Sequence, residues 1–325
     1  MKKILLGFAA ATFFASATSS AFAAEKVAIG VPSWTGAQAI AHLISVVVTD
    51  RIGGEVDLVP GNNATIFQAM DQGKGDIDVH PDVWLPNQES FTNKYVKGAG
   101  TVSLSENHYI GNQGFCVTRN FAEANNISDI ADLGRPEVAA KMDSDGNGKG
   151  EVWIGAPGWA SANVNEVKAR DYGLLAFIEP IRAEESVKTA RIKDAIAKNE
   201  GYGFYCYEPH AIWSMFDIVM VTEPKNDPAK YKMIQPSDSA NWYDESYVAS
   251  KDALKQVQVA YSNSLAGRSP AIAEFLANMQ LDAKDVSGFA YEIAGRGREP
   301  AEVAKEWVAK NSDRLMAGLA CNSRL

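Results

Sequence analysis

The order of the periodic segments along the chain constrains its fold most. Residues 26–31 and 55–59 are short apolar or alternating runs, which predict strands. Residues 37–50 and 64–72 carry apolar side chains at helical spacing, and residues 77–79 predict a further strand. Strands that alternate with helices are typical of a parallel sheet covered by helices. The first hundred residues therefore predict an α/β fold.

The same order recurs later in the chain. Helical patterns over residues 162–172 and 187–198 are followed by a strand-like run over residues 202–207. From residue 250 onward we expect mostly helix, with residues 301–310 as the clearest case. A chain of this length suggests two domains. No flexible linker separates them in the sequence, so we expect two interleaved domains.

The first 23 residues have the composition of a secretory signal peptide. Lys2 and Lys3 precede a mostly apolar run over residues 4–15, and Ala21-Phe22-Ala23 is a small-x-small cleavage pattern. The alternative, a membrane anchor, needs a longer apolar run than this one. We expect a cleaved leader over residues 1–23 and a periplasmic mature protein.

The charge balance excludes one class of partner. Removing the two leader lysines from 31 basic residues leaves 29 against 40 acidic residues, a formal net charge of −11. Proteins that bind nucleic acids normally present a basic surface. We therefore expect no nucleic-acid partner, and we expect a monomer.

Three cysteines leave the disulfide pattern open. Export permits a disulfide, and an odd number leaves at least one thiol without a partner in the chain. Cys116 and Cys206 both lie in strand-like runs and are the pair that we favour over Cys321. The alternative is that all three are buried thiols.

Four aromatic residues occupy similar places in the predicted fold. Trp34, Trp84, Trp159 and Tyr207 each follow or end a predicted strand, close to glycine or proline. Ligands of open parallel sheets bind beyond the carboxyl ends of the strands. Any one of these rings alone is better explained as a core residue, but four such positions favour a shared ligand site.

Several aromatic faces suit a cation that forms hydrogen bonds poorly. The face of an aromatic ring carries negative charge, and its attraction for a cation is worth about 0.5–2 kcal/mol. A quaternary ammonium group is the clearest example. A stacked sugar is the competing ligand, but it needs many polar side chains around the rings, and these loops contain few.

Three short stretches resemble the signatures of a known family. VHPDVWLPN, GAPGWAS and YEPHAIW are similar to stretches of the periplasmic glycine betaine, proline betaine and choline binding proteins of ABC importers. The resemblance implies a type II periplasmic binding protein, α/β in class, with two lobes joined by two crossover strands. It places residues 24–112 and 212–325 in one lobe and residues 113–211 in the other.

The resemblance also assigns roles to single residues. It implies that Trp34, Trp84, Trp159 and Tyr207 form an aromatic cage. Gly36 stands where the choline-binding branch has an aspartate, and Asn87 and Gln88 stand near a histidine position of betaine-binding relatives.

An anionic group on the ligand is also expected. Backbone N–H groups of Ala160 and Ser161 open a predicted helix, which favours an anion. We therefore expect a methylated ammonium zwitterion, glycine betaine first, with trimethylamine N-oxide, choline or dimethylsulfoniopropionate as alternatives. Tyr109 is a further candidate lining residue.

The stretch DSDGNGKGE, residues 143–151, is similar to the start of an EF-hand calcium loop. The twelfth position is Ile154 instead of the usual glutamate. The alternative is a plain glycine-rich turn. A structural calcium ion is the only cofactor that we consider, and its ligands would be Asp143, Asp145, Asn147, Lys149 and Glu151.

Catalysis has little support in the sequence. Neither G-x-S-x-G nor H-E-x-x-H occurs, and the four histidines lack metal-ligand spacing. An exported hydrolase of a small ester is the rival class of function. We predict a non-enzymatic, extracytoplasmic solute-binding protein whose partner is the membrane permease of an ABC transporter.

Overall fold

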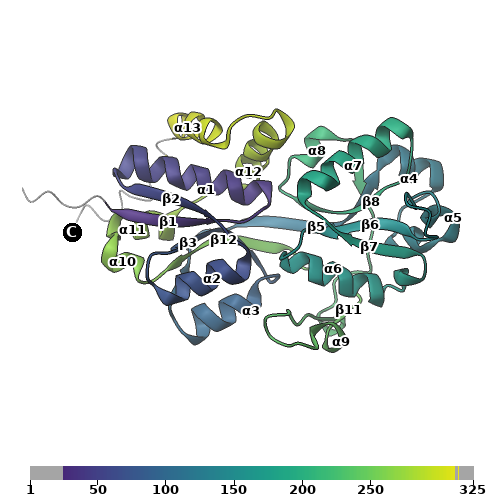
Figure 1. The fold of residues 1–325 in the computed structure, drawn as a ribbon, viewed down its shortest axis with the longest axis horizontal. Helices are drawn as coiled ribbons and strands as arrows, with labels where there is room; N and C mark the ends of the chain where they lie inside the picture. Colours follow the sequence, from purple (N-terminus) through teal and green to yellow (C-terminus); the bar gives the residue numbers. More distant parts are fainter. Residues whose placement is uncertain (1–24, 312–313, 315–325) are drawn as a thin grey trace, which may run out of the picture.

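The computed structural model describes residues 25–311 and residue 314, which form two lobes that lie side by side (Figure 1). The predicted leader and Cys321 lie outside the described residues. One path of hydrogen-bonded strands runs through both lobes in the order β2-β1-β3-β12-β5-β8-β6-β7. Strands β5 and β12 occupy the waist between the lobes (Figure 1). The expected two-lobed α/β architecture is confirmed.

Lobe I contains the first half of this path, with helices on both faces of the sheet (Figure 1). Strand β1 pairs in parallel with β2 and with β3, as the alternating order predicted. The elements of lobe I are β1 (Lys26–Val31), α1 (Thr35–Val47), β2 (Glu55–Pro60), α2 (Asn63–Gln72), β3 (Val79–Leu85), α3 (Glu89–Thr92), β4 (Val102–Leu104), β12 (Lys255–Ser262), α10 (Leu265–Arg268), α11 (Pro270–Asn278), α12 (Ala283–Ala290) and α13 (Pro300–Lys310).

Lobe II contains the second half of the path, with α7 and α6 on opposite faces (Figure 1). Strand β6 pairs in parallel with both β7 and β8. The elements of lobe II are β5 (Tyr109–Thr118), α4 (Arg119–Asn125), α5 (Pro136–Ala139), β6 (Gly150–Gly155), α6 (Ala160–Asp171), β7 (Ile178–Arg182), α7 (Glu185–Lys198), β8 (Gly203–Glu208), α8 (Ile212–Met215), β9 (Ile218–Met220), β10 (Tyr231–Lys232), α9 (Trp242–Glu245) and β11 (Tyr247–Val248).

Local sequence fixes the start of α2, which later proves to carry a site residue. The Asn62 side chain accepts a hydrogen bond from the Thr65 N–H, and the Thr65 hydroxyl accepts one from the Asn62 N–H. This reciprocal pair satisfies two donors that a helix start leaves free. Gly73 ends the helix with a left-handed φ of 63°. Asn63 is thereby held just beyond the carboxyl end of β2.

The return of the chain to lobe I comes later than residue 212, where the sequence had placed it. Strand β9 pairs with residues 116–118 of β5, and α6 contacts β11, so the segment from residue 218 to residue 248 packs on lobe II. The chain re-enters lobe I only with Lys255, the first residue of β12.

Two local predictions were wrong. Residues 255–262 form β12, a central strand that pairs antiparallel with both β3 and β5, in a region expected to be mostly helical. The sheet is therefore mixed, because β12 runs antiparallel to β3 and β5, which lie on either side of it. Pairing with β12 also extends β3 to Leu85, so Trp84 lies within a strand and not in the loop after it.

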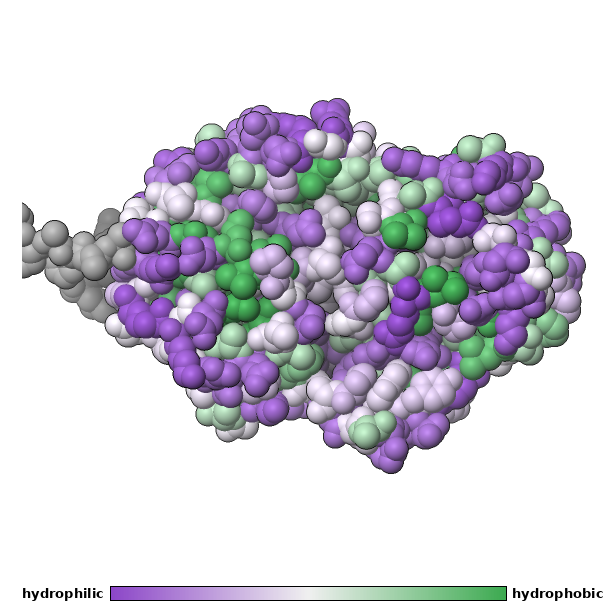
Figure 2. Space-filling view, viewed as in Figure 1, coloured by the Kyte–Doolittle hydropathy of each residue, from purple (hydrophilic) through white to green (hydrophobic). Residues whose placement is uncertain are grey.

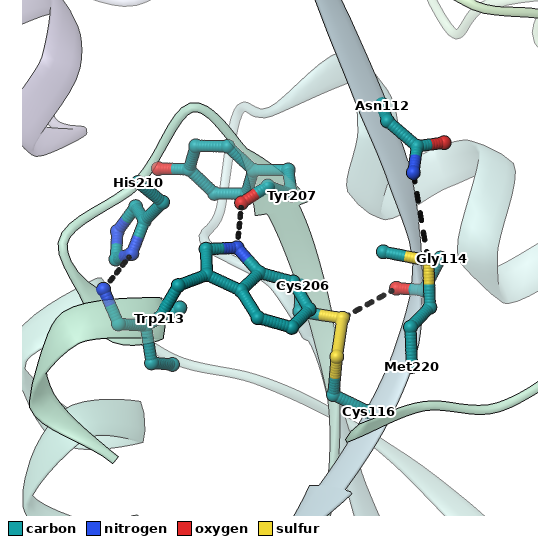
Figure 3. Close-up of a disulfide and its surroundings, with 9 residues drawn as sticks. Asn112, Gly114, Cys116, Cys206, Tyr207, His210, Trp213 and Met220 are labelled. Carbon is teal, nitrogen blue, oxygen red and sulfur yellow. Dashed lines mark hydrogen bonds between the residues drawn. A yellow bond between two sulfur atoms is a disulfide. The ribbon is translucent and has the colours of Figure 1, made fainter. Parts of the chain in front are cut away.

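A disulfide joins the two central strands of lobe II. Cys116 of β5 and Cys206 of β8 are bonded, with their Cα atoms 5.8 Å apart, which confirms the favoured pairing (Figure 3). Tyr207 follows directly, and its backbone carbonyl accepts a hydrogen bond from the Trp213 indole N–H at 2.9 Å. The disulfide and this bond hold the end of β8 in place.

The outer surface of the described residues is mostly hydrophilic, and none of their helices is suited to crossing a membrane. Hydrophilic residues cover most of the face shown in Figure 2, and apolar residues gather in only a few places. Within residues 25–311, no helix combines the length and the apolar character that crossing a bilayer requires.

Candidate ligand-binding site

A small cavity lies where the two lobes meet. About 340 Å³ of space between its walls is not filled by atoms, and this figure includes space that is open to solvent. Lobe I and lobe II both contribute to its wall, which consists of Trp34, Asn63, Trp84, Asn87, Gln88, Trp159, Ala160, Ser161, Tyr205 and Tyr207. A cavity of this kind suits a compact molecule.

Four aromatic rings in this wall form a cluster that spans both lobes. Trp34 lies 5.7 Å from Trp159 between ring centroids, and Trp159 lies 6.1 Å from Tyr207. Tyr207 in turn lies 5.4 Å from Trp84. Each of these contacts is edge-to-face, with interplanar angles of 76–83°. The rings therefore stand as the walls of a box and are not stacked.

The polar atom of each ring is hydrogen-bonded to a group that is not part of the cavity wall. The indole N–H groups of Trp34 and Trp84 both donate to Asp82 Oδ2, at 2.5 and 3.0 Å. The Trp159 N–H donates to Ser33 Oγ at 2.9 Å. These bonds fix the orientation of the rings and leave their carbon faces available to a ligand.

The fourth ring is fixed in the same way by Glu185, at the first turn of α7. The Tyr207 hydroxyl donates to Glu185 Oε1 at 2.7 Å. The other carboxylate oxygen accepts from the backbone N–H and the hydroxyl of Thr35, at 3.0 and 2.9 Å. Thr35 opens α1 in lobe I, so Glu185 ties a ring of the cluster to the opposite lobe.

The environment of Glu185 favours its ionised form. Burial alone would raise its pKa, but His210, Lys188 and the hydrogen bonds from His210 and Tyr207 hold that pKa well below its usual range. Burial lowers the pKa of the His210 imidazole. Its Nδ1 accepts from the Ile212 N–H, so we assign its proton to Nε2, which lies 2.9 Å from Glu185 Oε1.

Asp82 is a carboxylate buried directly behind two of the rings. Besides the indole groups, the Tyr109 hydroxyl donates to its second oxygen. Burial raises the pKa of Asp82, and the hydrogen bonds from Trp34, Tyr109 and Trp84 oppose that rise without cancelling it. The desolvation of this carboxylate is thus only partly offset by the protein.

The polar part of the wall presents one oriented amide. Asn63 Oδ1 is 2.9 Å from both His80 Nε2 and Gln88 Nε2. Burial lowers the pKa of His80 to about 3, so the ring is neutral, and because its Nδ1 accepts from the Asp82 N–H, its Nε2 is the donor. With its oxygen occupied, Asn63 directs its NH₂ group toward the cavity and the Gly158 carbonyl, 3.5 Å away.

The neighbouring amides have their hydrogen-bonding groups committed elsewhere. Asn87 accepts from Lys255 Nζ at 2.8 Å and donates to Gln113 at 3.0 Å. Gln88 accepts from the Trp84 N–H and donates to Asn63. Asn63 is therefore the amide best placed to donate to a ligand.

Backbone donors lie on the facing wall, at the start of α6. Trp159 is the residue that precedes this helix, and its side chain makes no capping bond there. Ala160 and Ser161, the first two helical residues, line the cavity. N–H groups in a first turn lack intrahelical partners and carry the positive end of the helix dipole. This end of the cavity is suited to an anionic oxygen.

The structure brings together six of the seven residues predicted to bind a ligand. Tyr109 is the exception, because it is buried behind Trp84 at 6.4 Å between ring centroids and does not line the cavity. Its contribution is the hydrogen bond to Asp82. Gly36 carries no acid, but Asp82 Oδ2 lies 3.7 Å from the place that a Cβ atom on Gly36 would occupy.

Sequence reasoning missed several residues of the site and its surroundings. Asp82 lies inside the motif VHPDVWLPN, and its place directly after Pro81 and two residues before Trp84 was the available signal. Asn63, Tyr205 and Glu185 carried no signal of their own, because their partners are distant in the sequence.

The predicted calcium loop runs into β6, whose second residue is Glu151, and none of its residues lines the cavity. Carboxylate oxygens of Asp143, Asp145 and Glu151 all lie within 4.8 Å of one another. The N–H groups of Gly148 and Gly146 donate to Asp143 and lower its pKa. The three carboxylates lie close enough together to share a calcium ion. The backbone hydrogen bonds to Asp143 would equally stabilise a plain turn. Calcium binding therefore stays a prediction.

Two α/β lobes with an aromatic-lined cavity between them are typical of two-lobed solute-binding proteins. The family model described as the substrate-binding domain of the ABC-type glycine betaine transport system (OpuAC) matches residues 25–310. The chain belongs to this family. Because the family consists of transport proteins, a binding function and not an enzymatic one is confirmed.

Individual relatives are distant. The chain is 22% identical over 182 residues to the glycine betaine/proline betaine-binding periplasmic protein of Salmonella typhimurium, and the match spans 54% of this chain and 53% of that protein. It thus spans about half the length of this curated relative.

Two solved structures share the fold. Lactococcal OpuAC, closed and complexed with glycine betaine, has a TM-score of 0.70 at 18% identity, over 90% of this chain and 99% of that one. An ABC-transporter choline binding protein in complex with choline has a TM-score of 0.70 at 15% identity, over 91% and 93%.

Proposed function

We propose that this protein captures glycine betaine, or a closely similar methylated ammonium zwitterion, between its lobes. The observation that carries the proposal is the box of four aromatic rings, two from each lobe, whose polar atoms are all hydrogen-bonded away from the cavity. A trimethylammonium group offers no hydrogen-bond donor, so ring faces are the surface that suits it. Sodium and ammonium ions would lose their hydration there without replacement.

The polar wall carries hydrogen-bond donors where the other walls carry aromatic faces, and this difference supports a zwitterionic ligand. The Asn63 NH₂ group and the first N–H groups of α6 are donors, and a carboxylate is the acceptor that they would satisfy. Choline has a hydroxyl in place of the carboxylate and would use these donors less well. Trimethylamine N-oxide and dimethylsulfoniopropionate both carry an anionic oxygen and remain the closest alternatives to glycine betaine.

We further propose that the protein works outside the cytoplasmic membrane and delivers its ligand to the permease of an ABC transporter. The disulfide between Cys116 and Cys206 suits an oxidising compartment. The leader pattern of residues 1–23 and the family to which the chain belongs support the same location.

One calorimetric panel tests the ligand assignment. Purified mature protein is titrated with glycine betaine, proline betaine, choline, carnitine, dimethylsulfoniopropionate and trimethylamine N-oxide. We expect the tightest binding from glycine betaine and weaker binding from choline. Binding of none of these compounds would refute the proposal. Turnover of a choline or betaine ester, followed by product release, would instead favour the exported hydrolase.

A further inference from the structure

Asp82 differs from every other fully buried acidic residue in the described part of the chain because no cationic side chain pairs with its carboxylate. Asp78 forms an ion pair with Arg268, and Glu185 lies 3.5 Å from Lys188 Nζ. Asp252 lies between two lysines, at 2.5 and 2.8 Å from their Nζ atoms. The side chain of Asp82 has only neutral donors around it, namely two indole N–H groups and one phenol.

A buried carboxylate without a cation is costly for the protein. Asp82 is 1% exposed, so water does not compensate its charge. Neutral hydrogen bonds reduce the cost, but a buried charge is normally paired with an opposite one. No lysine or arginine among the described residues fills that role, which leaves this charge to be balanced by a cation from outside the chain.

The position of Asp82 indicates where that cation would lie. Its Oδ2 atom is bonded to the N–H edges of Trp34 and Trp84, whose faces form part of the cavity wall. A negative charge at the N–H edge of an indole increases the negative character of its face, because the N–H dipole is polarised toward the carboxylate. Asp82 thus acts on the cage through two rings at once.

We propose that Asp82 is the counter-charge for the ligand's ammonium group and makes binding depend on positive charge as well as on shape. This inference rests on the proposed function, because it takes the ligand to be a methylated cation. Asp82 does not line the cavity, so it is a specificity-determining residue that acts through the rings. The rival role is purely structural: Asp82 would only hold the two indoles in place.

The substitution Asp82→Asn separates charge from positioning. Both indole N–H groups donate to the same oxygen, so a single amide oxygen can accept both bonds. The amide NH₂ group then faces the Tyr109 hydroxyl, which is able to accept a hydrogen bond. The variant therefore keeps the shape of the site and both indole hydrogen bonds, reverses the bond with Tyr109 and removes the charge.

The test compares two ligands of the same shape by calorimetry. In 3,3-dimethylbutanoate a carbon atom replaces the ammonium nitrogen of glycine betaine, so the cage meets a neutral tert-butyl group. For Asp82→Asn we expect glycine betaine affinity to fall on the order of 10- to 100-fold, as for loss of a nearby charge in a partly shielded site. The affinity for 3,3-dimethylbutanoate should stay unchanged or rise. Equal losses for both ligands, or no loss for glycine betaine, would overturn the inference.

Thermal unfolding of the ligand-free proteins gives a second readout that does not depend on the weak ligand. Removing an uncompensated charge should raise the melting temperature of Asp82→Asn, whereas the matched control Asp252→Asn breaks a paired charge and should lower it. A decrease for both variants would show that Asp82 is a structural acceptor. Failure of the wild-type protein to bind any methylated cation would refute the proposed function itself, independently of the Asp82 variant.

Discussion

Replacement of Trp159 tests the aromatic cage most directly. The ring contacts Trp34 of lobe I and Tyr207 of lobe II, and its N–H group bonds to Ser33 across the lobes. Trp159→Ala removes a ring face worth about 0.5–2 kcal/mol to a cation. It also removes a hydrogen bond worth about 0.5–1.5 kcal/mol and the apolar contact of the ring. We expect a total loss of about 2–4 kcal/mol, or roughly 30- to 1,000-fold in affinity.

Graded substitutions separate these contributions. Trp159→Phe keeps a ring face but loses the N–H group, so it should bind more weakly than the wild type and more tightly than Trp159→Ala. Ser33→Ala removes only the interlobe hydrogen bond and should cost about 2- to 10-fold. All variants are titrated with glycine betaine by calorimetry after their folding has been checked by circular dichroism.

A matched control lies far from the cavity wall. Trp307 in α13 is half-buried, contacts Phe289 and donates to Asp285 at 3.1 Å. Trp307→Ala should lower the melting temperature and leave the affinity per folded molecule unchanged. Wild-type affinity in both Trp159→Ala and Trp84→Ala would refute the cage and the function that rests on it.

Three further predictions follow from the interlobe contacts and the acidic loop. The lobes should close on the ligand, so glycine betaine should decrease the radius of gyration in small-angle scattering; an unchanged radius at saturation would contradict this. Glu185→Gln leaves one acceptor oxygen for the bonds to Thr35 and Tyr207, so the affinity for glycine betaine should fall about 10-fold. The depressed pKa keeps Glu185 ionised in the wild type. Its contribution to affinity should therefore be constant between pH 8 and pH 5 and decline only below the usual carboxyl range. If the acidic loop holds calcium, a chelator should lower the melting temperature and added calcium should restore it. Asp145→Ala should abolish this response and keep the affinity for glycine betaine within a few-fold of the wild type. A chelator without effect on the melting temperature would favour the plain turn.

The sequence determined the local elements well. Helical spacing over residues 37–50 and 187–198 identified α1 and α7 to within a few residues, because an apolar stripe with period 3.6 is a local property of the chain. Strand β12 was missed. It directly precedes the helices α10 to α13, and its burial comes from pairing with β3 and β5, which no local window contains.

The sequence also indicated which rings would meet. Strand ends of a parallel sheet share one edge. Trp34 and Trp159 follow β1 and β6, and Tyr207 lies at the end of β8, so these three rings could be expected together. Tyr109, named separately as a further lining residue, lies behind Trp84, because the alternation of side chains along β5 decides which of them face the cavity. Type and order of elements are therefore enough to locate such a site, but not to assign every residue in it.

The groups that support the rings were decided only by the tertiary structure. Glu185 reaches Thr35 across 150 residues, and Asp82 reaches Trp34 across 48. A carboxylate in the sequence looks the same whether it is solvated or buried, and its pKa and its partners depend on which segments the fold brings against it. The aromatic residues and their strands could thus be inferred from the chain alone, whereas the uncompensated charge behind the cage and the bond that joins the lobes exist only once both lobes have packed together.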